Sequence, residues 1–390
     1  MRYVKYFLLS FIALGIFFPS FVRAANVAQD KMTIVKAKVV DVLTQTTESY
    51  PGSQVQTPIQ SLQVEIIEGA DNGKEVVFDN DYVMLKKGDV FYLSYTTDPD
   101  NTPYYSVFEP DRVPVLLFLA ILFIVLALIF GGLQGLRGLL SLSGSLLIII
   151  FVLLPAIIHG FPPLLVSIIV SSLIIILGSY VTHGFNKTTS SAVVGMIVTV
   201  IITGVMAYFS VHSSQLTGIT GDDSIYLNFN IRGGIDLVGL LMGGIMIGLL
   251  GVLYDVSIGQ SIAVEELHKI APHINRWNIY KRAIRIGREH IGALVNTLAI
   301  AYVGASLPLL LLFYSGADAS FAVIVNREVF ATEIIRILIG SIGLVLAVPI
   351  TTLLAVYMLI KKDMFNQKAD LSTEILQKEK KALEHFKHQH

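Results

Sequence analysis

The chain has 390 residues, of which 54% are hydrophobic and only 15% are charged. This balance is typical of polytopic membrane proteins and excludes an ordinary soluble enzyme. The formal net charge of -1 gives no sign of a nucleic-acid partner, and the absence of cysteine excludes disulfides, thiolate metal sites and thiol nucleophiles.

The first 25 residues have the pattern of an export signal. Arg2 and Lys5 precede an apolar run over residues 7–18, and residues 22–24 resemble a small-residue cleavage site. We therefore predict a removed signal peptide over residues 1–25. The alternative is an uncleaved first helix, and with either one the next segment is exported.

Residues 26–111 form the sizeable polar region that precedes the apolar spans. Strand-like alternation occurs over residues 34–42, 62–67, 75–78 and 90–95, with turn signals at residues 71–73, 79–81 and 87–89. Four or five short strands separated by such turns predict a small antiparallel barrel or sandwich, similar to an OB-fold. We interpret this domain as an all-β cap on the outer side of the membrane.

The rest of the chain consists mainly of apolar spans, each near the length that crosses a bilayer. We predict a seven-helix membrane domain over residues 112–362, followed by a charged tail over residues 363–390. The spans are residues 113–130, 139–158, 164–181, 192–209, 235–254, 291–314 and 331–360.

Positive charge is distributed unevenly among the loops between these spans. One set of loops carries most of the lysines and arginines, whereas the other set holds only Arg232 and Arg327. The positive-inside rule then places the β domain outside and the C-terminus in the cytoplasm.

The span over residues 235–254 ends next to a carboxylate, Asp255. At 100° per residue, Gly244, Gly248 and Gly251 fall within about 40° of Asp255, so we expect another helix to pack closely on this side. No charge occurs over residues 256–264. If the helix continues, Gly259, Ile262 and Glu266 return to the same face.

An ionisable group at membrane depth costs a few kcal/mol or more, and it is normally paired, hydrated or functional. Asp255 is therefore our main candidate for a proton or transport site, with Glu266 on its face and Asn296 or His290 as candidate neighbours on the next span. The alternative is an interfacial aspartate that accepts hydrogen bonds from nearby backbone. No pair of histidines in or near the spans has metal-ligand spacing, and we predict neither a metal nor a cofactor.

Two local patterns lead to further expectations. Residues 279–288 have an apolar side and an arginine-rich side, which predicts an amphipathic helix lying on the cytoplasmic face of the membrane. Glu333 and Arg336 are three residues apart, so they are able to pair on one helix face.

Several sequence segments resemble the YibE/F family of bacterial membrane proteins. They are GLRGLLSL (135–142), LPAIIHGFPP (154–163), GLLGVLYDVSI (248–258), EEL (265–267), IGREHIG (286–292), NTLAIAY (296–302) and GASLP (304–308). Together with the exported β domain, the resemblance covers nearly the whole mature chain. It implies a multi-pass plasma-membrane protein and little more about function.

A second, shorter resemblance concerns residues 251–255. GVLYD, followed by an acidic helix and an arginine-rich turn, is similar to the fourth and fifth helices of SecD/SecF and RND-type exporters. The resemblance implies that Asp255 belongs to a proton path. This chain departs from that pattern in having two more spans after the exported domain.

These observations favour a transporter or exporter, proton-coupled through Asp255, for a small solute or a lipid-like substrate. The alternative is a membrane receptor or assembly factor that presents the β domain to a partner, and a homo-oligomer is left open. We do not expect an enzyme, because Asp236 and Asp255 are separated by about 28 Å on one helix and cannot form an aspartyl dyad with each other.

Overall fold

The computed structural model describes residues 32–49, 56–97, 103–230, 234–315 and 320–360. The predicted signal peptide and the charged tail both lie outside the described residues. The chain divides into two compact units, residues 1–130 and 131–390, and each is described by itself. The sequence predicts a membrane domain that begins at residue 112, before this division of the chain.

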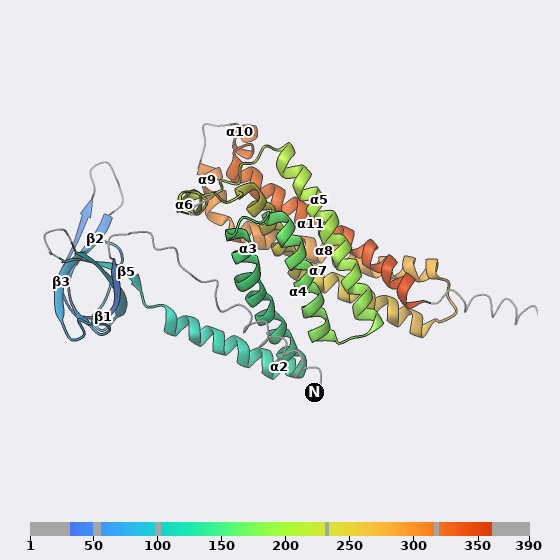
Figure 1. Cartoon of the computed structure of the whole chain (residues 1–390), viewed down its shortest axis with the longest axis horizontal. Coiled ribbons are helices and arrows are strands. Elements are labelled where there is room, and N and C mark those ends of the chain that lie inside the picture. Colours follow the sequence, from blue (N-terminus) through green and yellow to red (C-terminus); the bar gives the residue numbers. More distant parts are fainter. Residues whose placement is uncertain (1–31, 50–55, 98–102, 231–233, 316–319, 361–390) are drawn as a thin grey trace, which may run out of the picture. The chain divides into compact units, whose positions relative to one another are not determined.

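The first unit contains a five-stranded antiparallel sheet. Its strands are β1 (Thr33–Ser49), β2 (Gln56–Ile66), β3 (Glu75–Asn80), β4 (Val90–Thr97) and β5 (Pro103–Pro110), in the order β3-β2-β1-β4-β5. The sheet curls so that the edge strands β3 and β5 contact each other, which makes it a half-barrel (Figure 1). This confirms the all-β domain that the alternating pattern predicts. Strand β5 was not among the segments predicted.

The core of the half-barrel follows the strand alternation. Val35, Ala37 and Val39 on β1 are buried, and they pack against Phe91, Leu93 and the inward residues of β2 and β3. The loop before β4 is held by Gln60, whose side chain accepts from the Leu85 backbone at 2.8 Å and donates to the Leu85 carbonyl at 3.0 Å. The buried amide of Gln60 thus substitutes for a missing strand partner.

One ion pair links β1 to the end of the sheet and makes the unit sensitive to acid. Lys36 Nζ lies 3.0 Å from Asp111 Oδ2, and this contact lowers the pKa of Asp111. A lowered folded-state pKa contributes stability above the unfolded pKa that is lost as the pH falls through the folded one. We expect hydrogen exchange of residues 90–111 in the full chain, corrected for intrinsic rates, to accelerate below about pH 4. Lys36→Met and Asp111→Asn should lack this acid dependence, and an unchanged dependence in either would contradict the assignment.

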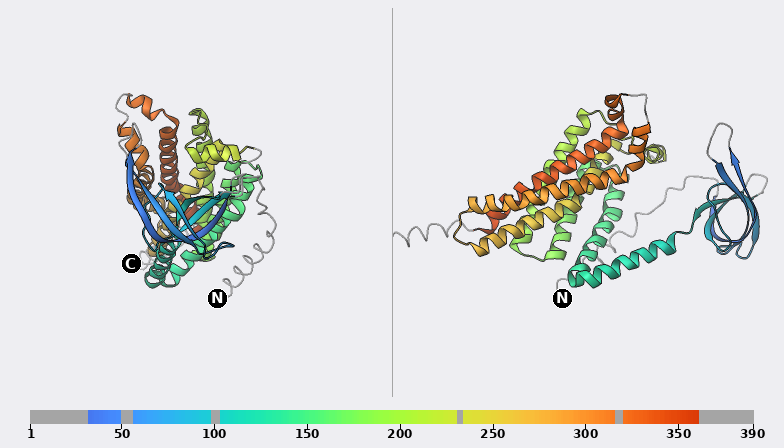
Figure 2. Two further views of the ribbon diagram at one scale, coloured as in Figure 1. Left: turned by 90° about the vertical axis from the view of Figure 1, so that its left-hand side faces the viewer. Right: turned by 180° about the vertical axis from the view of Figure 1, so that it is seen from behind.

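The second unit is a helical bundle centred on two long helices, α7 (Leu237–Ile270) and α11 (Glu328–Leu359). Helix α11 packs against α5 (Lys187–Ser213), α7 and α8 (Arg276–Ala305), and α4 (Pro163–His183) packs against α5 and α7 (Figures 1 and 2). The remaining helical elements are α2 (Val113–Ile148), the π-helical turn η1 (Ile149–Leu153), α3 (Leu154–Ile158), α6 (Asp222–Asn230), α9 (Leu307–Ser315) and α10 (Phe321–Val325).

Five helices in the described residues are long and apolar enough to cross a membrane, and a sixth span results if α8 and α9, bent by 72°, count as one. Two of the seven predicted spans fall in the single run Val113–Ile158 of 46 residues. At 1.5 Å per residue this run is about 69 Å long, more than twice the hydrocarbon core. It is broken at Gly132, whose φ of 53° and ψ of -136° are not helical.

The amphipathic segment near residue 280 does not lie separately on the membrane surface as predicted. It is the first part of α8, which continues without a break into the sixth span. Its apolar side packs inside the bundle through Ile279 and Ala283, which join Val264 of α7 and Ala355 and Val356 of α11 in one cluster. An apolar stripe on a helix satisfies a protein neighbour as well as a lipid surface, so periodicity alone did not distinguish the two.

The two ends of the bundle differ in charge. One end, which we call the basic end, is formed by the C-terminal ends of α4, α7 and α11 and the starts of α5 and α8. Its exposed cations are Arg137, Lys187, Lys269, Lys281, Arg282, Arg285 and Arg288. At the opposite end Glu328 accepts hydrogen bonds from the Thr217 hydroxyl and from the backbone of Thr217 and Gly218.

Candidate functional site

Asp255 lies on α7 at the level where α4 ends. Helix α4 has 21 residues, about 31 Å, which matches one hydrocarbon thickness. It begins beside Gly239 and Gly243 of α7 and ends at His183, whose ring lies 5.8 Å from that of Tyr254. Asp255 is therefore one residue past the end of an apolar span, and α7 continues for another four turns.

The carboxylate of Asp255 is exposed on the surface of this unit. Within the described part of the chain it forms no ion pair, and no hydrogen bond joins it to the neighbouring backbone. The alternative of an interfacial aspartate that caps nearby backbone thus finds no support in these contacts.

Of the glycines next to Asp255, Gly248 forms the close helix contact that we expected, whereas Gly244, Gly251 and Gly259 do not. A Cβ built on Gly244, Gly251 or Gly259 would meet no atom within 4 Å, whereas one on Gly248 would meet the Tyr302 hydroxyl. The side of α7 that packs in the bundle instead carries bulky residues, including Ile245, Met246, Leu249 and Leu253. Gly244 and Gly251 therefore face outward, and burial of large apolar side chains determines the orientation of the helix.

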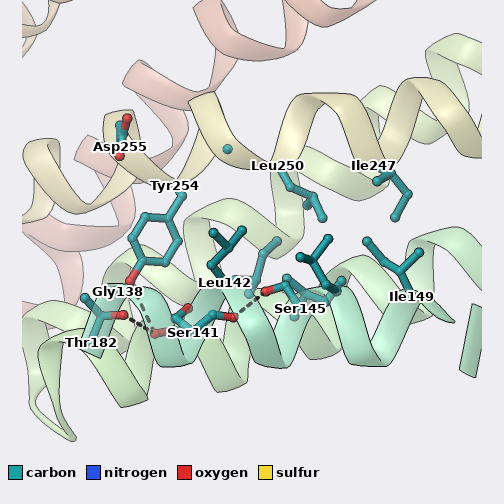
Figure 3. Close-up of a pocket in the computed structure, with 15 residues that line it drawn as sticks. Gly138, Ser141, Leu142, Ser145, Ile149, Thr182, Ile247, Leu250, Tyr254 and Asp255 are labelled. Carbon is teal, nitrogen blue, oxygen red and sulfur yellow. Dashed lines mark hydrogen bonds between the residues drawn. The ribbon is translucent and has the colours of Figure 1, made fainter. Parts of the chain in front are cut away.

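A groove of about 410 Å³ runs along α7 beside this stripe, with Asp255 at its rim (Figure 3). Helices α2 and α4 and the turn η1 form its other walls. The lining is mainly apolar. The lining residues are Gly138, Ser141, Leu142, Ser145, Leu146, Ile149, Ile174, Ile175, Gly178, Thr182, Ile247, Leu250, Gly251, Tyr254 and Asp255.

The polar groups of the groove gather toward the end where Asp255 lies (Figure 3). The Tyr254 hydroxyl donates to the Gly178 carbonyl at 3.3 Å, and the Thr182 hydroxyl donates to the same oxygen at 2.8 Å. A Cβ on Gly178 would lie 2.8 Å from Ser141 Oγ, so α2 approaches α4 closely here. The groove thus has a hydroxyl-lined end beside a carboxylate and an apolar remainder.

Within the described residues, no hydrogen bond or ion pair joins the other predicted site residues to Asp255. Glu266 is exposed near the end of α7 and its carboxylate lies 2.8 Å from Lys269 Nζ. Asn296 and His290 are exposed on α8, and among the described residues neither has a hydrogen bond to Asp255. Asp255 lines the same groove as Tyr254, Thr182 and Ser141, which the sequence did not single out.

A second polar feature, which we call the hydroxyl belt, lies buried between α5, α7 and α11. Thr351 Oγ1 donates to Ser257 Oγ at 3.1 Å and Ser191 Oγ donates to Ser261 Oγ at 3.2 Å. Gln260 is fully buried, with Oε1 2.9 Å from Thr352 Oγ1, and its Nε2 has no hydrogen-bond partner among the residues that the structure describes. The belt consists of Ser191, Thr199, Thr203, Ser257, Gln260, Ser261, Thr351 and Thr352.

The sequence contained a signal for this belt. Ser191, Gly195, Thr199 and Thr203 recur every four residues, which places them on one face of α5. Small and hydroxyl-bearing residues at that spacing are typical of close helix pairs in membranes. We did not predict the belt, because the glycine stripe of α7 offers a small-residue face of the same kind.

Comparison with family models identifies the chain. The model described as YibE/F-like protein matches residues 119–361, more than half of the chain. The chain belongs to this family. The match runs from α2 to just past α11, so the groove, Asp255 and the hydroxyl belt all lie in the family region, whereas the half-barrel lies outside it.

The family assignment confirms the main resemblance noted in the sequence, and it supports a membrane protein with several apolar spans. A search of curated proteins and a search of solved structures found no match. The chemistry of this YibE/F-like protein must therefore be argued from its own residues.

Proposed function

We propose that the protein is a membrane transporter or exporter in which Asp255 takes up and releases a proton during each cycle. The observation that carries this proposal is a carboxylate, without an ion-pair partner in the described structure, at the rim of a groove in the membrane unit. Such a group at membrane depth is costly, and proteins keep it where it binds protons, ions or substrates.

The two sides of the groove differ in how tightly their helices are packed, and this difference favours movement of one side against the other. Helices α5 and α11 are held together by close contacts of Gly195 with Thr351 and of Gly343 with Thr203, and Gly343 also contacts Leu249 of α7. On the other side, the wall contains the π-helical turn η1, and Ile149 of that turn lines the groove. Single π-turns are common at functional sites because a helix can shift its hydrogen bonding there. We propose that the α2–η1 wall moves against the α5–α7–α11 block.

The charge distribution supports an orientation in the plasma membrane of a bacterium. Most exposed cations of the membrane unit gather at the basic end, with Arg327 at the opposite one, and the positive-inside rule assigns the basic end to the cytoplasm. The half-barrel then lies outside, behind a signal peptide over residues 1–25, and the C-terminal tail lies in the cytoplasm. Asp255 lies at the cytoplasmic boundary of its span.

Proton flux into proteoliposomes tests the assignment of Asp255. We expect Asp255→Asn to reduce protein-dependent proton flux, measured with an entrapped pH dye under an imposed membrane potential, at least tenfold. Asp255→Glu should retain part of the flux, because it keeps a titratable carboxylate. Asp223→Asn on α6 is the matched control and should leave the flux unchanged.

The variant must also elute as a single species with the thermal stability of the parent, since the carboxylate makes no contact that the fold requires. Undiminished flux in folded Asp255→Asn would rule out the proton role. In that case the flux measured in the same proteoliposomes still shows whether the protein transports protons without Asp255.

The second candidate function is a receptor or assembly factor that acts through its exported domain. It is favoured by the half-barrel, which has a hydrophobic core of its own. Deleting residues 26–111 separates the two functions, because a receptor should lose all activity whereas a transporter should keep basal proton flux through the membrane unit.

A further inference from the structure

The lining of the groove beside Asp255 carries negative charge without a matching positive charge. Asp255 is the one charged residue among its 15 lining residues, and no lysine, arginine or histidine is present. The charged and titratable side chains on the surrounding elements are Arg137 on α2, His183 on α4, and Arg288, Glu289 and His290 on α8. In the described structure none of these cations forms an ion pair with Asp255.

The hydroxyl groups beside the carboxylate are oriented as acceptors. A hydroxyl has one proton, and those of Tyr254 and Thr182 are both donated to the Gly178 carbonyl. Ser145 likewise donates its proton to the Ser141 carbonyl at 2.9 Å. The remaining lone pairs of these oxygens accept hydrogen bonds, so a ligand group rich in N–H donors matches this end of the groove.

The rest of the groove matches an apolar body. Ile149 and Ile247 lie toward the other end from Tyr254 (Figure 3), and α2 and η1 line the groove from Gly138 to Ile149, about 16 Å of helix. A volume of about 410 Å³ falls in the range of sites for small organic molecules.

We infer that the groove binds amphipathic molecules that carry a single positive charge, with the cationic group at Asp255 and the apolar part along α2 and α7. This inference rests on the proposed transport function for its last step and not for binding itself. A cation neutralises the carboxylate and removes the cost of an unpaired charge, whereas an anion would be repelled and a neutral amphiphile would leave that charge unpaired.

The same carboxylate cannot hold a proton and a cation at once. A proton and a monovalent cation therefore compete for Asp255, so each crossing carries one or the other at this carboxylate. Binding strengthens as the pH rises, because only the deprotonated carboxylate pairs with the cation.

Binding of radiolabelled dodecylammonium to the full-length protein in nanodiscs of zwitterionic lipid tests the inference. We expect saturable binding that strengthens between pH 5.5 and pH 8. Asp255→Asn should weaken it more than tenfold, whereas Asp255→Glu should retain it. Tyr254→Phe should weaken it severalfold. Unlabelled dodecyl sulfate and dodecanol should not displace the probe at matched membrane concentration.

Equal affinity in the parent and in Asp255→Asn, or displacement by dodecanol as strong as by dodecylammonium, would overturn the inference. Its failure is distinguishable from failure of the proposed transport function. Loss of proton flux in Asp255→Asn without any cation binding refutes the ligand class alone, whereas saturable cation binding without proton flux supports the ligand class and refutes transport.

Discussion

Gly195→Ala is expected to destabilise the membrane unit by about 1–3 kcal/mol, whereas Gly244→Ala is expected to stabilise it by up to about 1 kcal/mol. A Cβ on Gly195 would lie 2.5 Å from Thr351 Oγ1 and 2.9 Å from Thr351 Cα. The second atom belongs to the backbone of α11, so one of the two helices has to move. A Cβ on Gly244 meets no atom within 4 Å, and alanine there only improves helix propensity.

Thermal unfolding of the full-length protein in one detergent, followed through retention of the monodisperse peak, measures both variants. The two substitutions add the same methyl group to glycines of long spans. Shifts of Tm in opposite directions would therefore report the packing around each glycine and not the effect of the methyl group itself. A Gly195→Ala protein as stable as the parent would show that the contact between α5 and α11 is looser than described. Destabilisation by Gly244→Ala would show that a partner covers the outward face of α7.

Span positions and the strand domain were predictable because they depend on local composition. Apolar runs of sufficient length mark the helices, and the alternation of residues 34–42 marks a strand whose inward side chains are now seen buried. The pairing of Glu333 with Arg336 was also predictable from their spacing, and it is confirmed at 2.9 Å.

The environment of Asp255 was less predictable, because it depends on which side of α7 faces the bundle. Helical angles correctly grouped Gly244, Gly248, Gly251 and Asp255 on one side. They did not show that Gly244 and Gly251 face outward while Gly248 lies against Tyr302, since that is decided by the packing of the opposite side of α7 against α5 and α11. The hydroxyls of Tyr254 and Thr182 come from different helices, and no local pattern brings them together.

Strand β5 and the break in α2 were missed for related reasons. Pro103 and Pro110 bound β5, and the segment between them is mostly half-exposed, so its alternation is weak. The break in α2 occurs at one of two consecutive glycines. Composition indicates that a turn is permitted there but does not say which glycine makes it.

Gly132→Ala is expected to disrupt the membrane topology of the protein, whereas Gly131→Ala is expected to leave that topology unchanged. Gly132 has φ 53° and ψ -136°, a conformation that L-residues avoid, while Gly131 is not among the residues with positive φ. Neither glycine would bring a Cβ within 4 Å of another atom, so the two sites differ in backbone conformation and not in space. Alanine at position 132 in this conformation would strain the backbone by about 1–3 kcal/mol. A helix that continues through the position without a break avoids that cost.

An unbroken helix over residues 113–158 cannot serve as two membrane crossings, so the segment after it would lose its proposed place outside. The absence of cysteine makes this measurable with a single introduced thiol. In Phe161→Cys, at an exposed position between α3 and α4, a membrane-impermeant maleimide should label intact cells. Adding Gly132→Ala should reduce labelling severalfold relative to total protein, and adding Gly131→Ala should not. Equal labelling in the two double variants would show that the break does not need glycine, and that the apolar lengths on either side suffice to direct the second crossing.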